Sequence, residues 1–150
     1  MSTKIGLNIS TIYDINLLEQ NISCRLVRLY GRIRFEKEKG WSNEYRAIID
    51  TGSPVSLIPS SIWKEIKLEF LSQKEFPILG IAKEESEPIL ARIATVKLVF
   101  IDPETTSSSF RVKAYLLPTD HIPLLFGFED LLTEYKLFCD YKNNSAYLEF

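Results

Sequence analysis

Near the end of its first third, the chain reads Ala47-Ile48-Ile49-Asp50-Thr51-Gly52-Ser53. Such an apolar run predicts a buried strand, and a carboxylate directly after two β-branched residues is costly there unless it finds a partner. Gly52 allows another segment or a ligand to come close, and the hydroxyls of Thr51 and Ser53 offer hydrogen bonds. We therefore expect the chemistry of this protein at Asp50.

A second motif, Leu124-Leu125-Phe126-Gly127, lies downstream and precedes a short helical pattern and a terminal hairpin pattern. Asp50-Thr51-Gly52-Ser53 after an apolar strand resembles the active-site signature of aspartic proteases, and the second motif resembles the apolar-apolar-glycine element of retropepsin-like domains. Either motif alone is weak evidence, because Asp and Gly often form an ordinary turn at a strand end. The ordered pair is a stronger indication, and the resemblance covers about residues 26–150.

This resemblance implies a mainly β fold, a small closed β-barrel of the retropepsin type with one or two short helices and a flap hairpin. Residues 1–25 are then an N-terminal arm or edge strand, and residues 26–150 form the protease domain. A chain of 150 residues has room for one such domain, but not for two lobes that each carry an aspartate signature. Because this family uses two aspartates, the resemblance implies a homodimer.

The resemblance also assigns a role to each residue of the first motif. Two Asp50 carboxyls, one from each chain, would share a proton and activate water to hydrolyse a peptide bond. Thr51 would brace this dyad across the interface, Gly52 would accommodate the close approach, and Ser53 would hydrogen-bond the outer carboxylate oxygen. In the second motif, Leu124, Leu125 and Gly127 would form the apolar-glycine element. The substrate would be an extended polypeptide, and no metal or organic cofactor is required.

By position, Gly80, Ile81 and Ala82 belong to the flap that covers substrate in such proteases. The residues that follow are Lys83, Glu84, Glu85 and Glu87, whereas flaps of this family usually carry several glycines near the tip. An alternative is therefore a catalytically inactive retropepsin-like module that dimerises or binds peptides. A structural β-domain in which Asp50 caps a turn is another alternative. A serine or cysteine hydrolase is the weakest one, because His121 is the sole histidine.

Composition and charge exclude several other classes of protein. Hydrophobic residues make up 45% and charged residues 25% of the chain, as in soluble globular proteins. A net charge of −2 argues against nucleic-acid binding, which needs a basic surface. Neither a secretory signal nor a run of membrane-spanning length is present, so we expect a cytoplasmic protein without membrane contact. Cys24 and Cys139 are expected to be reduced thiols, since their spacing fits no metal site.

Alternating apolar residues predict most of the strands. Residues 26–35 and 41–49 are expected to form one hairpin, residues 110–116 a half-buried strand, and residues 137–141 and 146–150 a final hairpin. The asparagines between the last two strands suit a turn with positive φ. We expect Ala146, Leu148 and Phe150 to form an apolar face on the last strand, which a second copy would cover in the dimer.

Two helices and one further hairpin are predicted from less regular patterns. Residues 59–66 predict a short helix with a serine cap, and residues 129–135 predict a helix with acidic residues in its first turn. Residues 76–81 and 89–100 flank the charged stretch and fit a long hairpin. A helix over residues 89–100 remains open as well, because Leu90, Ile93 and Lys97 lie at helical spacing.

Overall fold

The structure is a computed structural model that describes residues 1–78 and 88–150. It is mainly β, with 47% of residues in strands and 9% in three short helices. The prediction of a mainly β fold is therefore confirmed. The predicted flap residues Gly80, Ile81 and Ala82 lie outside the described residues, so their role stays a prediction.

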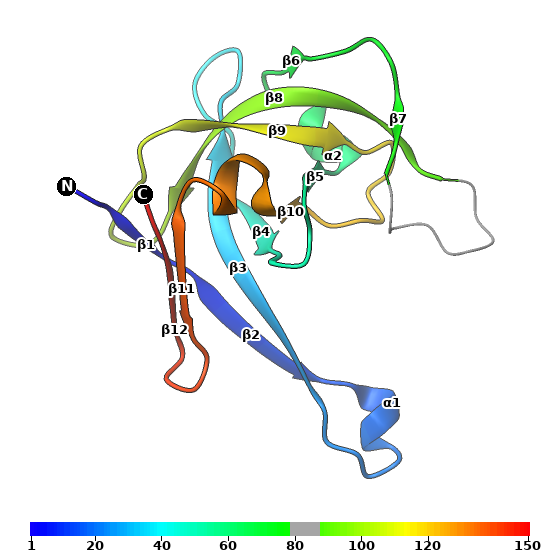
Figure 1. The fold of residues 1–150 in the computed structure, drawn as a ribbon, viewed down its shortest axis with the longest axis vertical. Helices are drawn as coiled ribbons and strands as arrows, with labels where there is room; N and C mark the ends of the chain where they lie inside the picture. The colour runs from blue at the N-terminus through cyan, green and yellow to red at the C-terminus, as the bar shows by residue number, and fades with distance from the viewer. Residues whose placement is uncertain (79–87) are drawn as a thin grey trace.

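The helices and strands follow one another along the chain as Figure 1 labels them. They are β1 (Lys4–Gly6), β2 (Asn8–Tyr13), α1 (Ile15–Leu18), β3 (Arg25–Phe35), β4 (Tyr45–Ile49), β5 (Ser56–Ile58), α2 (Ser60–Trp63), β6 (Glu69–Phe70), β7 (Phe76–Pro77), β8 (Leu90–Ile101), β9 (Phe110–Leu116), β10 (Leu125–Phe126), the π-helix η1 (Phe128–Leu132), β11 (Lys136–Asp140) and β12 (Ser145–Glu149).

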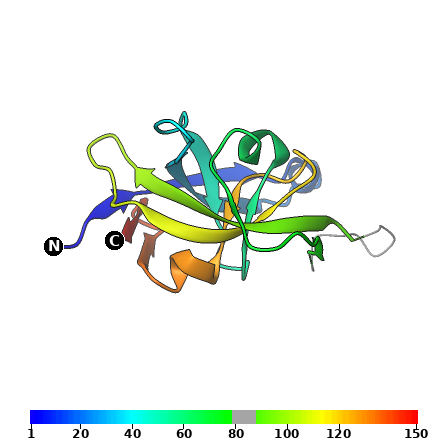
Figure 2. The same cartoon turned by 90° about the horizontal axis from the view of Figure 1, so that it is seen from above.

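Nine of these strands form one large sheet. Its order is β2-β3-β4-β10-β5-β9-β8-β6, with β7 also paired to β8. Strand β3 pairs with β8 as well as with β4, so the strand order returns on itself. The long strands β8 and β9 run side by side across the molecule (Figure 2). Because β8 has strand neighbours on both sides, the alternative of a helix over residues 89–100 is wrong.

The predicted hairpin of residues 26–35 and 41–49 is present as β3 and β4. In its second half β3 alternates as expected, with Gly31, Ile33 and Phe35 buried. Gly31 lies under the ring of Phe100, and a Cβ there would come within 2.6 Å of that ring. Phe35 and Phe100 both contact Phe126, so three strands share one aromatic core.

Two loops of the sheet are closed by the same arrangement of a buried serine. The Ser42 hydroxyl accepts from Phe35 N–H at 2.9 Å and donates to Asn43 C=O at 2.8 Å. The Ser107 hydroxyl accepts from Phe100 N–H at 2.9 Å and donates to Ser108 C=O at 2.8 Å. Both hydroxyls are satisfied away from water, and they fix the two connections at the end of the sheet far from Asp50.

A smaller sheet has the order β1-β12-β11 and brings the two ends of the chain together. Ala146 and Leu148 are buried in the chain's own core, and Phe150 packs against Phe110 and Tyr135. The predicted final hairpin is confirmed, including a positive φ of 53° at Asn144. The argument that its apolar face needs a second copy is wrong, since the core of the same chain already covers that face.

Asp102, in the loop after β8, ties β1 to this loop. Its carboxylate accepts hydrogen bonds from the backbone N–H groups of Gly6, Glu104 and Thr105 at 2.7 to 2.9 Å. Burial raises the pKa of Asp102, but these three donors and the charge of Arg32 outweigh it, so the pKa lies below its ordinary value.

Both predicted helices are shorter or less regular than their patterns indicate. Helix α2 covers only four residues, and its N-cap is Pro59, which makes no side-chain cap. The Asp120 carboxylate accepts from Ser61 N–H at 2.8 Å, so a carboxylate from a distant loop replaces the expected serine cap. In η1, Asp130 adopts φ +64° and accepts from the backbone N–H of Lys113 on β9 at 2.8 Å, which interrupts helical geometry.

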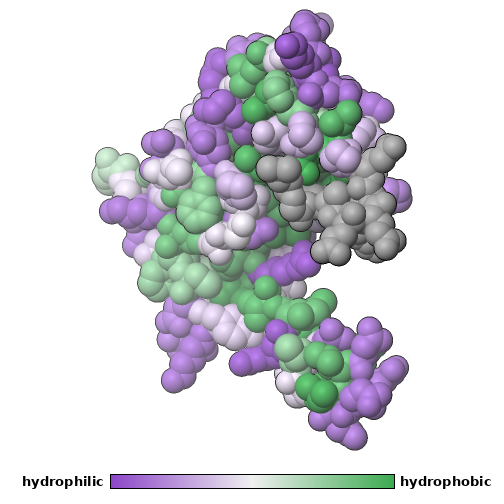
Figure 3. All heavy atoms as spheres, turned by 45° about the vertical axis from the view of Figure 1, so that its right-hand side comes forward, coloured by the Kyte–Doolittle hydropathy of each residue, from purple (hydrophilic) through white to green (hydrophobic). Residues whose placement is uncertain are grey.

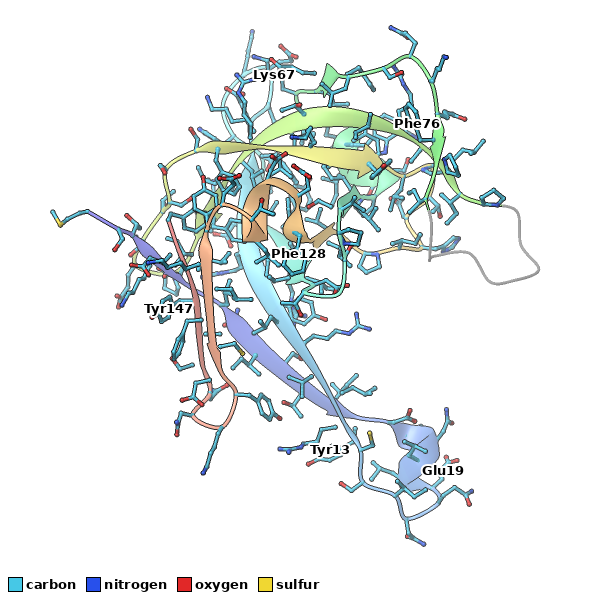
Figure 4. All side chains as sticks on the ribbon, viewed as in Figure 1. Tyr13, Glu19, Lys67, Phe76, Phe128 and Tyr147 are labelled. Carbon is cyan, nitrogen blue, oxygen red and sulfur yellow. The ribbon has the colours of Figure 1, made fainter. Side chains whose placement is uncertain are left out.

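Residues 1–25 supply β1, β2, α1 and the first residue of β3, and β2 is the edge strand of the large sheet. Strand β2, helix α1 and the first half of β3 (residues 8–30) project from the body as a long two-stranded ribbon, with Tyr13 and Glu19 toward its tip (Figure 4). We call this segment the ribbon. Among the described residues, no helix has the length and apolar character to cross a membrane.

Candidate functional site

Strand β10 brings the two sequence motifs together. It lies between β4 and β5, parallel to β4 with Leu125 opposite Ile48 and antiparallel to β5 with Leu125 opposite Leu57. At the end of this arrangement Asp50 N–H donates to Phe126 C=O at 2.9 Å. Asp50 and Gly127, 77 positions apart in the chain, therefore follow directly after neighbouring strands. Leu124 is buried and Leu125 half-buried beneath them.

The Asp50 carboxylate is held by the turn that follows it. Gly52 N–H donates to Asp50 Oδ1 at 2.8 Å, and Ser53 N–H donates to the Asp50 carbonyl at 3.3 Å. A Cβ at position 52 would lie 3.2 Å from that Oδ1, so glycine leaves the carboxylate oxygen room at its donor. Asp50 is half-buried, whereas Thr51 and Gly52 are exposed. The turn thus fixes the carboxylate while leaving its surroundings open.

Ser53 does not make the contact predicted for it. Its hydroxyl donates to Val55 C=O at 2.7 Å, and a hydroxyl carries a single proton to donate. The predicted bond from Ser53 to the outer carboxylate oxygen is therefore wrong for the single chain, where Gly52 N–H supplies the donor instead. Thr51 has no side-chain hydrogen bond within the described parts of the chain, so its predicted bracing role stays a prediction.

Gly127 lies against the loop between β4 and β5. A Cβ at this position would meet the carbonyl oxygen of Ser53 and, at 2.5 Å, that of Val55. The backbones meet this closely because Phe128 N–H donates to Ser53 C=O at 3.0 Å and Glu129 N–H to Pro54 C=O at 3.2 Å. Phe128 is labelled in Figure 4 just after β10. The second motif thus holds the loop that carries the aspartate, and glycine is the residue that permits this.

Ser56 is a further member of the site that the sequence reasoning missed. It is fully buried at the start of β5, and its hydroxyl accepts from Gly127 N–H at 3.2 Å. A hydroxyl within the apolar run of residues 55–58 was the available signal, because a buried polar side chain requires a partner. Ser56 joins the β5 end of the site to β10.

A cavity of about 560 Å³ opens beside Asp50. It is lined by residues 27–29 of β3, residues 48–51, Pro123 and Leu125. Most of its lining side chains are apolar, and Arg28 and Asp50 are the charged ones among them. Such a cavity fits a ligand that presents apolar side chains together with a polar group for the carboxylate.

No group of three or more His, Cys, Asp or Glu side chains able to hold a metal ion occurs within residues 1–78 and 88–150. Cys24 and Cys139 are both exposed and free of a disulfide. Comparisons with protein-family models, with curated proteins and with solved structures gave no match to this chain.

Proposed function

We propose that this protein is an aspartic endopeptidase of the retropepsin type that acts as a homodimer. The observation that carries the proposal is the junction of β4 and β10, where the Gly52 N–H holds the Asp50 carboxylate and Gly127 packs on the same loop. This junction places an aspartate at an open surface on a rigid support, as a catalytic carboxylate requires.

Further support comes from the course of the large sheet. The pairing of β3 with both β4 and β8 is the one expected of a small closed barrel of this protease type. Strands β7 and β8 pair at Phe76 and Ala91, and Ile78 N–H donates to Ile89 C=O at 2.9 Å. This pairing is consistent with the base of a flap hairpin.

The chemistry needs two carboxyls, and each chain supplies one. In the dimer, the ionised Asp50 takes a proton from water, whose oxygen attacks the scissile carbonyl carbon. The protonated Asp50 of the second copy donates its proton toward the carbonyl oxygen as the tetrahedral intermediate forms. Two carboxyls at contact distance cannot both ionise cheaply, so they share one proton.

The proposed substrate is an extended polypeptide that lies in the cavity beside Asp50. The cavity offers Val27, Leu29 and Leu125 to apolar side chains, while the scissile bond lies over the carboxylates. An extended peptide also presents backbone groups that pair with strand-like segments of a protease.

The substitution Asp50→Asn tests this proposal. In a homodimer it changes both carboxyls, so cleavage of a mixed peptide library should fall to background, which initial rates across a pH series will show. The fold should remain, because the asparagine side-chain oxygen still accepts from Gly52 N–H. Thermal melting and sedimentation of the mutant should match the wild type.

Asp140→Asn is the matched control, since Asp140 caps the turn between β11 and β12 and touches no residue of the site. Cleavage by Asp50→Asn at the wild-type rate would refute the catalytic role of Asp50. If the wild type cleaves no member of the library but retains peptides in a pull-down, the alternative of an inactive peptide-binding module replaces the endopeptidase.

A further inference from the structure

The ribbon carries an unusual share of exposed apolar side chains. Fifteen large hydrophobic residues are exposed among the described residues, and seven of them lie between positions 12 and 27. Their exposed fractions range from 42% to 70%. They are Ile12, Tyr13, Ile15, Leu18, Ile22, Leu26 and Val27. Figure 3 shows this hydrophobic surface where the ribbon projects from the body. Exposed apolar side chains gathered on one segment in this way mark an interaction surface.

The ribbon carries exposed apolar side chains on both faces, although Tyr141 of the β11–β12 hairpin contacts Thr11 and Arg25 on one of them. Ile12 pairs with Leu26 on one face, and Thr11 pairs with Val27 on the other, so exposed apolar side chains occur on each side. A two-stranded ribbon is marginally stable in water unless it packs on something. Strand β2 moreover forms an edge of the large sheet, which leaves backbone groups open to another strand.

The base of the ribbon and the candidate active site share one surface. Val27, Arg28 and Leu29 line the cavity that Asp50 and Thr51 also line. A second copy that places its Asp50 against this one must therefore also meet the ribbon. In a twofold dimer each ribbon then contacts the other copy, because such an interface uses the same patch twice.

Charge favours a second copy over a nucleic acid or an anionic membrane. The ribbon carries two acidic residues, Asp14 and Glu19, and two basic residues, Arg25 and Arg28. This balance produces no net repulsion between two identical ribbons, and it lacks the basic excess that phosphate groups attract. The strands at the chain ends are already paired with each other within the chain. The exposed apolar side chains near Asp50 that a second copy could bury are therefore those of the ribbon.

We infer that the ribbon is the dimerisation element of this protein and that it packs against a second copy of the chain beside the Asp50 cavity. The inference rests on the proposed function only in taking the site to be incomplete without a second Asp50. It replaces the chain-end strands with residues 12–27 as the centre of the interface.

The double substitution Ile12→Ser/Leu26→Ser tests this inference by sedimentation equilibrium over a wide range of protein concentrations. Removal of two interface anchors should raise the dimer dissociation constant at least tenfold, ~1.4 kcal/mol per factor of ten. The matched control is Trp41→Ser/Leu71→Ser, because these side chains are 42% and 51% exposed in loops at the opposite end of the molecule. The control should dimerise as the wild type does.

Three outcomes would overturn the inference: a wild type that is monomeric at every concentration, a ribbon variant that dimerises like the control, or a monomer that instead binds lipid vesicles. Hydrogen exchange of the wild type above and below its dissociation constant is the second measurement, in case the variant does not fold. Protection within residues 12–27 should rise with dimerisation, and unchanged protection refutes the inference.

Peptide cleavage is assayed separately, so the two proposals fail in different ways. A ribbon-dependent dimer that cleaves no peptide supports the inference and removes the endopeptidase. An active dimer that the ribbon substitutions leave intact removes the inference and keeps the endopeptidase.

Discussion

The substitution Gly127→Ala should damage the support of Asp50 without touching the aspartate itself. The new Cβ would overlap the carbonyl oxygens of Ser53 and Val55 and lie 2.9 Å from the Ser53 carbonyl carbon. These are backbone atoms, so no side chain can rotate away to relieve the contact. The loop between β4 and β5 must move instead, and Asp50 moves with it.

The cost follows from what this loop would lose. Forcing an extra methyl into a packed position costs about 1–3 kcal/mol. The hydrogen bonds from Phe128 N–H to Ser53 and from Glu129 N–H to Pro54 would stretch or break, at about 1 kcal/mol each. The sum is about 3–5 kcal/mol, a large part of the roughly 5–15 kcal/mol that a domain typically has. At about 2–4 °C per kcal/mol, Tm should fall by about 6–20 °C.

Urea unfolding and calorimetry of the purified variant measure this loss. Gly6→Ala is the matched control, because a Cβ there would be in ordinary contact, 3.5 Å from Asp102 Oδ2. Its free energy of unfolding should stay near the wild-type value. A Gly127→Ala variant within about 0.5 kcal/mol of the wild type, the range of neutral surface substitutions, would refute the reasoning that the second motif holds the aspartate loop.

The remaining predictions concern polar side chains that accept hydrogen bonds from the backbone. Ser42→Ala and Ser107→Ala should each lower the free energy of unfolding by about 1–3 kcal/mol in urea titrations, since each leaves a buried N–H without an acceptor; an effect no larger than that of the exposed Ser108→Ala would contradict this. Because the folded-state pKa of Asp102 is lowered, its stabilisation is present at neutral pH and is lost as pH falls through that value. Asp102→Ala should cost about 1–2 kcal/mol at pH 7, and the difference from the wild type should shrink in acid; an equal difference at pH 3 would argue against a charged acceptor.

The sequence predicts this fold best where one rule dominates. Alternation of apolar residues predicts the second half of β3 and the whole of β9, because these segments have one face in the core. Residues 129–135 show where this fails. Acidic residues suit a helix N-terminus, but Asp130 bonds to Lys113 on β9, and a partner on a distant strand is invisible to local rules.

At the site, the neighbourhood of Asp50 and Gly127 was predictable only through the order of the two motifs. The hydrogen-bond partner of the Ser53 hydroxyl could not be predicted from the sequence. The carbonyl of Val55 and the carboxylate of Asp50 compete for its single proton. The partner of the last strand was not predictable either. Ala146 and Leu148 show the same apolar face whether the core of the same chain or a second copy covers it.

The pairing of β1 with β12 has a consequence for how the chain acquires its structure. Residues 4–6 pair with residues 147–149, so the smaller sheet joins two strands that lie 141 to 145 positions apart in the sequence. Closing so long a loop is entropically expensive and slow compared with forming a hairpin. During translation, β1 lacks its strand partner until β12 has been synthesised. The smaller sheet is therefore expected to form late, after the large sheet has formed the surface against which β1 and β12 pack.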